Sequence, residues 1–191
     1  MRRLYLTVIL LTLVTQSAPA GDSPINAGSV VPGGSIYLER TTGELHRDMT
    51  VVSLHPNVMV FVKRGLAVGA NLLYEHRHLS YGHVNTVSVG PQIGYFIDTS
   101  PSRAEAAGKI MPFVTLFGNY TYEGQKWEGP FKPWGLDRLD IGGSAGAAVF
   151  LSNTMSLDVS LLAVHNTAFY EYRNRHGWTF RFGMGLSGYL Y

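Results

Sequence analysis

The sequence lacks cysteine, is poor in charge, and has no long apolar run beyond its first twenty residues. Without cysteine there is no disulfide framework, no thiolate zinc site and no cysteine nucleophile. Charged residues are 15% of the 191, against about 25% in average proteins, which argues against disorder or a coiled coil. The formal charge of +2 gives no electrostatic footprint for nucleic acid. Beyond the first twenty residues no apolar run reaches the length of a membrane-spanning helix.

The first twenty residues have the pattern of a secretory signal peptide. Two arginines precede an apolar run over residues 4–14, and a small-x-small cleavage motif ends at Ala20. We expect residues 1–20 to be removed after Ala20, which leaves 21–191 as a single domain. Removal would leave 13 basic residues against 13 acidic ones, so the basic excess belongs to the leader.

The rest of the chain is rich in glycine, tyrosine and side chains that alternate with period two. Trp178, Phe180, Phe182, Met184 and Leu186 alternate with residues such as threonine, arginine and glycine, which predicts a strand with one apolar face. The same pattern predicts eight strands, over residues 28–41, 49–62, 66–76, 83–97, 110–122, 139–150, 155–165 and 177–191. Several exceed the usual 5–6 residues and match the roughly 9–11 of a tilted membrane strand.

The predicted connections alternate between short and long. Residues 63–65 and 152–154 are three-residue turns, and the link over 98–109 is a longer exception. The intervening connections are all longer: 42–48, 77–82, 123–138 and 166–176. Short turns at one end and long loops at the other are typical of an outer-membrane barrel, in which the sheet must close because lipid cannot satisfy an open edge.

We therefore predict an all-β fold, an eight-stranded antiparallel up-and-down transmembrane β-barrel. A soluble barrel of lipocalin type, exported to the periplasm to bind a ligand, is the alternative architecture. The polar faces of the predicted strands carry mostly glycine, serine, threonine and asparagine. A solvated surface would need more lysine and glutamate, so the composition favours the membrane barrel.

Four stretches resemble the small outer-membrane β-barrel family of OmpA, OmpX and the opacity proteins: SLHPNVMVFVKRGLAVGANLLYE, VSVGPQIGYFI, GGSAGAAVFLSNTMSLDVSLLAV and FRFGMGLSGYLY. The resemblance implies a location in the outer membrane, contact with its lipid and insertion by the barrel-insertion machinery. The aromatic C-terminal residue, Tyr191, resembles the signal which that machinery reads. Tyr191 falls on the face opposite to Leu190, and a bulge near Gly188 would bring it back into phase.

Inside such a barrel, Arg181 would point into the lumen from the middle of the last strand. A charge there needs a partner, and Glu75, Asp140 and Asp158 are the candidates. We expect a structural ion pair that fills the barrel, because eight strands leave no open channel.

The segment 123–138 is the best candidate for a surface-binding loop, because Trp127, Phe131 and Trp134 lie among its charges. Its partner would be an extracellular ligand or protein. The alternative is that these aromatic residues pack against the barrel or join its interfacial girdle.

Two histidine patterns invite a chemical interpretation. His76, His78 and His83 could meet around a metal, but their spacing is not diagnostic, and we predict neither metal nor cofactor. His165, Thr167 and Glu171 would supply a base, a hydroxyl and a carboxylate for lipid A hydrolysis at the outer rim. The His-x-Ser element of lipid A deacylases is missing, so we predict a non-enzymatic structural or surface-interaction protein, with the hydrolase as an alternative.

Overall fold

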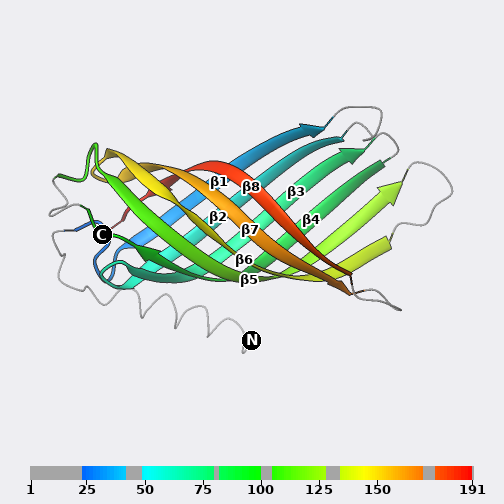
Figure 1. Cartoon of the computed structure of the whole chain (residues 1–191), viewed down its shortest axis with the longest axis horizontal. Coiled ribbons are helices and arrows are strands. Elements are labelled where there is room, and N and C mark those ends of the chain that lie inside the picture. The colour runs from blue at the N-terminus through cyan, green and yellow to red at the C-terminus, as the bar shows by residue number, and fades with distance from the viewer. Residues whose placement is uncertain are drawn as a thin grey trace, which may run out of the picture.

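The computed structural model describes residues 23–41, 49–79, 82–99, 105–127, 134–169 and 175–190, and the predicted leader lies outside them. Within these residues the chain forms eight strands (Figure 1). They are β1 Val30–Thr41, β2 Met49–Lys63, β3 Leu66–Leu79, β4 Gly82–Phe96, β5 Ile110–Trp127, β6 Trp134–Ser152, β7 Met155–Phe169 and β8 Arg175–Gly188. No helix among the described residues is long and apolar enough to cross a membrane.

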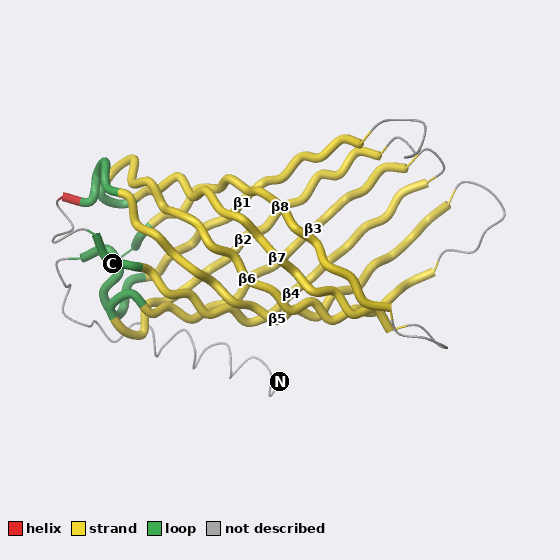
Figure 2. The backbone as a smooth tube through the Cα atoms, in the orientation of Figure 1, coloured by secondary structure: helices red, strands yellow, loops and turns green. Residues whose placement is uncertain are grey.

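The eight strands close into one barrel in sequence order, each antiparallel to its neighbours (Figure 2). Closure is made by β1 and β8, which pair from Gly33↔Ser187 to Ile36↔Met184, with a further bridge between Val30 and Leu190. Each strand thus has two hydrogen-bonded neighbours, and the seam between β1 and β8 is paired over fewer residues than any other pair of neighbouring strands. The predicted eight-stranded antiparallel up-and-down barrel is confirmed.

Tight turns define one end of the barrel. Gly65 takes a φ of 77° in the turn between β2 and β3, a conformation that favours glycine. Its N–H donates to the carbonyl of Ile25 at 3.0 Å, so the start of the described chain lies at this end too. Residues Asn153 and Thr154 form the matching turn between β6 and β7. The two short turns lie where the sequence pattern predicted them.

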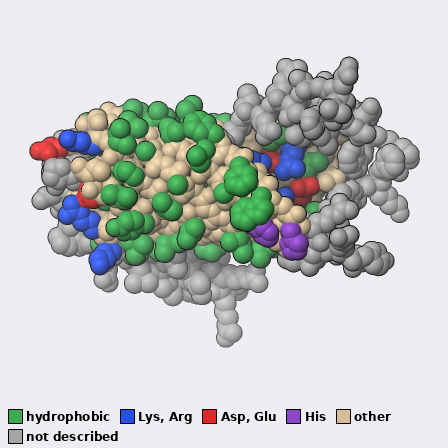
Figure 3. All heavy atoms as spheres, viewed as in Figure 1, with side chains coloured by type: hydrophobic (Ala, Val, Ile, Leu, Met, Phe, Trp, Pro, Cys, Tyr) green, Lys and Arg blue, Asp and Glu red, His purple; other side chains and the backbone are tan. Residues whose placement is uncertain are grey.

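Alternation puts apolar side chains outside the barrel and polar ones inside along most of its length (Figure 3). On β8, Phe180 and Phe182 are 75% and 61% exposed on the outside. The phase holds to the end of the described chain, because Tyr189 is buried and Leu190 is exposed. The pairing of β7 with β8 contains no register shift, so the bulge considered near Gly188 is absent there, and Tyr191 lies outside the described residues.

The inside of the turn end is apolar and closed by side chains. Phe96 contacts Phe61 at a ring-centroid distance of 5.2 Å and Phe113 at 5.4 Å, while Phe150 packs on Tyr189 at 4.8 Å. Further buried residues complete this cluster, which we call the apolar plug: Ile25, Val31, Met59, Ala67, Ala106, Met111 and Ala148. The plug seals the barrel at the end where its turns are shortest.

The strands continue further at the other end than the sequence pattern predicted. β5 runs to Trp127 and β6 starts at Trp134, and Gln125 pairs with Trp134 in register. The predicted 16-residue loop 123–138 was wrong in its bounds, because its flanks hold charged residues that resemble a loop in sequence. In the barrel those side chains alternate as the rest of the strand does, and their inward members find partners inside.

Gly90 on β4 tests how closely the wall is packed. A Cβ there would overlap the carbonyl oxygen of Gly118, whereas a Cβ on Gly118 would meet nothing within 4 Å. We predict that Gly90→Ala lowers the free energy of unfolding by about 1–3 kcal/mol, since crowding a packed site forces the backbone to shift. Gly118→Ala, the matched control, should stay within about 0.5 kcal/mol of the parent. Urea titration of the refolded protein, followed by tryptophan fluorescence, measures both, and equal effects would contradict this packing.

Candidate functional site

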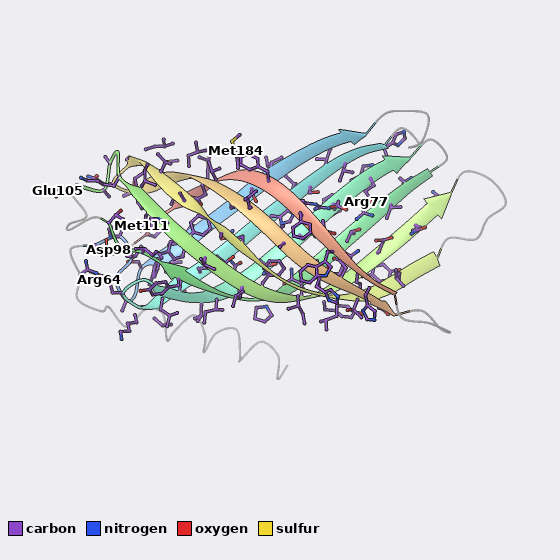
Figure 4. All side chains as sticks on the ribbon, viewed as in Figure 1. Arg64, Arg77, Asp98, Glu105, Met111 and Met184 are labelled. Carbon is purple, nitrogen blue, oxygen red and sulfur yellow. The ribbon has the colours of Figure 1, made fainter. Side chains whose placement is uncertain are left out.

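Six charged side chains gather inside the barrel, in the half that lies away from the turns. Period two puts Glu75 and Arg77 of β3 on the inward face together, and does the same for Arg138 and Asp140 of β6. The remaining two are Glu123 of β5 and Arg181 of β8. Arg77 lies toward the end of the barrel opposite Arg64 and Asp98 (Figure 4). We call these six residues the charge network.

Glu75 is the centre of one half of the network and is completely buried. Its Oε2 is 2.7 Å from a guanidinium nitrogen of Arg181 and accepts a hydrogen bond from the Ser53 hydroxyl at 3.0 Å. Its Oε1 accepts a hydrogen bond from Nε of Arg77. One carboxylate therefore joins two arginines from opposite sides of the closing seam, which offsets the cost of burying each charge.

The other half of the network centres on Arg138. Its Nε and Nη2 donate to the two oxygens of Asp140 at 2.6 and 2.8 Å, a bidentate pair. Glu123 links the halves, at 3.5 Å from Arg138 and 4.0 Å from Arg77. The Thr121 hydroxyl donates to Asp140 at 2.7 Å. Three arginines thus face three carboxylates, and the network carries no net charge.

Sequence reasoning singled out Arg181 with three candidate partners, and the structure brings it together with Glu75. Asp140 belongs to the network but pairs with Arg138. Asp158 lies nearer the apolar plug, where it accepts hydrogen bonds from the hydroxyls of Ser156 and Ser187. The sequence pattern did not predict Arg77, Glu123 and Arg138 as inward charges, because they lie at or beyond the predicted strand ends. Continuing the alternation past those ends would have found them.

Beside the charge network, the lumen contains a cavity of about 130 Å³ that is lined by charged, amide and hydroxyl side chains and by a few apolar ones. Amide side chains from several strands line it, and Nδ2 of Asn119 donates to Oδ1 of Asn71 at 2.6 Å. Oδ1 of Asn57 is buried without a protein partner. Buried polar atoms of this kind are commonly satisfied by water, so the cavity has the size and chemistry of a small hydrated space.

The histidines proposed as metal ligands lie on the outer face of the wall, near the ends of β3 and β4. The rings of His76 and His83 are 5.9 Å apart, and Nδ1 of His76 lies 2.7 Å from Oδ1 of Asn85. His78 is exposed. Over the described part of the chain, no group of three or more histidine, aspartate or glutamate side chains is arranged to hold a metal.

The residues considered for hydrolysis also lie on the outer face. His165 packs against Trp178 and His176, with ring-centroid distances of 5.0 and 5.7 Å. The imidazole beside the Thr167 hydroxyl is that of His176, whose Nδ1 is 3.2 Å away. Glu171 lies outside the described residues, so the structure brings His165 together with aromatic rings and Thr167 together with another histidine.

The described residues include only part of the predicted surface-binding loop 123–138. Trp127 is the last residue of β5 and Trp134 is the first residue of β6. The side chains of both, and the whole of Phe131, are outside the part of the chain that the structure describes. The segment between these strands is therefore 128–133, much shorter than expected.

Comparison with known proteins gives a match of fold. No family model matches the chain, and no curated protein matches it in sequence. Among solved structures, the crystal structure of Neisserial surface protein A (NspA) is similar, with a TM-score of 0.52 over 88% of this chain and 98% of that one. The two sequences are 12% identical, so the likeness concerns the fold. It bears out, at that level, the predicted resemblance to small outer-membrane barrels.

Replacing the central carboxylate tests the charge network. We predict that Glu75→Gln lowers the free energy of unfolding by about 3–5 kcal/mol, because it leaves Arg77 and Arg181 inside the barrel without their shared anion. A second change, Arg181→Met, should restore part of the loss by removing one of those cations. Urea unfolding of the refolded variants measures the change.

The matched control is the exposed pair of Arg64 with Asp98 at the turn end. Arg64→Gln should cost less than about 1 kcal/mol, since solvent screens that pair. If Glu75→Gln costs no more than this control, the network does not hold the lumen together.

Proposed function

We propose that this chain is a small outer-membrane β-barrel protein with a structural or surface-interaction role and no open pore. The observation that carries the proposal is the apolar exterior of the closed barrel. Among the described side chains, outward positions between the turn end and the level of Tyr120 are free of lysine, arginine, aspartate and glutamate. The outward charges Lys126 and Asp137 lie beyond that level, near the outer ends of β5 and β6. The charged side chains of that region point inward instead, as Glu75, Arg181 and Asp158 do.

The height of this apolar exterior fits a bilayer. On β4 and at Ile97, the residue that follows it, the outward side chains from Val87 onward are all exposed and, apart from Pro91 and Tyr95, aliphatic. Ten residues of strand cover about 34 Å, which a tilt of about 40° reduces to about 25 Å along the barrel axis. That height is the one expected for the apolar band of an outer-membrane barrel.

Aromatic residues border this band on its outer side. Tyr74, Tyr120, Tyr122 and Trp178 are all exposed on the outer wall, where β3, β5 and β8 approach their outer ends. Tyrosine and tryptophan favour the boundary between lipid and water, because their rings are apolar and carry one polar group. Their position supports membrane insertion over the soluble, ligand-binding barrel.

The side chains that fill the lumen argue against the conduction of ions through the barrel. The charge network crosses the outer half, and the apolar plug fills the turn end. An ion would have to displace both, and eight strands leave little space beside side chains. A transport function would need a path that this packing opposes.

Contact with partners would fall to the segments at the outer strand ends, including 128–133 with Phe131, flanked by Trp127 and Trp134. The environment we propose is outer-membrane lipid, reached through the signal peptide and the barrel-insertion machinery. The lipid A hydrolase alternative is less well supported, because His165 packs on Trp178 and His176 in place of a nucleophile.

Fractionation tests the proposal. We predict that the expressed chain sediments with the outer membrane and that its unheated form migrates faster on a gel than its boiled form, because a closed barrel resists detergent. Leu161→Arg, outward in the middle of the apolar band, should reduce the folded band, since a charge there costs about 2–4 kcal/mol.

His78→Arg is the matched control, because that outward position lies beyond the apolar band and should tolerate a charge. A chain that stays entirely in the soluble fraction, or that accepts both arginines equally, would overturn the proposal.

A further inference from the structure

One stretch of the outer wall is hollowed. The hollow runs over β5, β6, β7 and β8 with a volume of about 980 Å³, and most of its lining is apolar. We call it the wall groove. Figure 3 shows large apolar side chains and histidines along this part of the barrel.

The strand register explains the hollow. One row across the four strands reads Leu116, Gly143, Ala163 and Phe180, so two small residues lie between two large ones. The row on the turn side reads Val114, Ala145, Leu161 and Phe182. Gly143 and two alanines therefore form a floor, with the aliphatic side chains of β5 on one side and the phenylalanines of β8 on the other.

The outer end of the wall groove changes from apolar to polar. The next row places His165 opposite Trp178, and both line the groove. The ring of His176 stacks on that of His165 at 5.7 Å, with an interplanar angle of 14°. Two imidazoles thus stand side by side at the level where the exterior leaves the apolar band. Imidazole N–H groups donate hydrogen bonds to phosphate oxygens.

We propose that the wall groove binds an acyl chain of a membrane lipid whose headgroup presents a phosphate monoester to His165 and His176. The inference rests on the proposed function, because the groove must face lipid for a chain to enter it. The apolar lining matches the hydrocarbon, and the paired imidazoles match the anionic headgroup at its outer end. A second copy of this chain is the other conceivable occupant, and the test separates the two.

Trp178 is a built-in reporter, since it lines the wall groove and is one of three tryptophans. The full chain carrying Trp127→Phe and Trp134→Phe is refolded into phosphatidylcholine vesicles. A few mole per cent of phosphatidic acid or of phosphatidylcholine is then added, each brominated on one acyl chain. We expect brominated phosphatidic acid to quench Trp178 about threefold more strongly than brominated phosphatidylcholine at equal mole fraction. This corresponds to less than a tenfold difference in affinity between the two lipids.

Two changes dissect the site in that background. His165→Phe with His176→Phe keeps the ring shapes and removes the N–H donors, so the preference for phosphatidic acid should vanish. Ala163→Leu fills the floor and should lower quenching by both lipids. Ala70→Leu, also outward but on β3, is the matched control and should leave quenching unchanged.

Equal quenching by the two lipids in the parent would overturn the inference, as would a preference that survives the histidine replacement. Quenching that Ala163→Leu leaves intact would also overturn it, and so would a self-associated form in which neither lipid reaches Trp178. A folded barrel that neither lipid quenches, without self-association, would refute the proposed membrane insertion as well. Heat-modifiable gel mobility of every variant shows that it has folded.

Discussion

The pairing of backbone groups is the constraint on which the rest of this structure depends. In hydrocarbon every strand N–H and C=O must find a partner within the protein, and the pairing of residues 33–36 of β1 with residues 184–187 of β8 closes the sheet. Once eight strands close, period two leaves no freedom: each residue points into the lumen or away from it. The phase of the alternation in each strand therefore determines both the apolar exterior and the polar interior.

The closed wall then determines what the interior can contain. Charges inside a narrow barrel are costly unless paired, and the three arginines and three carboxylates of the charge network satisfy one another across β3, β5, β6 and β8. The turn end is filled by the apolar plug around Phe61, Phe96 and Phe113, which buries no charge. Beside the charge network lies a cavity of about 130 Å³, which is too small for a large ligand. Recognition is thus left to the outer strand ends and the outer wall.

The sequence predicted the number of strands, their order and their faces, because alternation such as Trp178, Phe180 and Phe182 puts the apolar side chains of a strand on one face. It placed the outer strand ends too early, because Glu123 and Arg138 look like loop residues until a lumen exists for them to enter. The same cause concealed half of the charge network. Arg181 could be recognised as an inward charge, but choosing Glu75 over Asp158 required the register. The wall groove required it too, since Gly143 and Ala163 become neighbours only through strand pairing.

The most direct test of this account is the accessibility of successive residues along β8, which a chain without cysteine makes simple. Single cysteines at residues 179 to 186, spin-labelled in the refolded barrel in lipid vesicles, report contact with oxygen, which partitions into lipid, or with a water-soluble nickel complex. The account predicts that labels at Phe180, Phe182, Met184 and Leu186 contact oxygen preferentially, while those at the positions between them do not. Even-numbered positions that instead favour the nickel complex would show that the apolar face does not meet lipid, and would contradict the account.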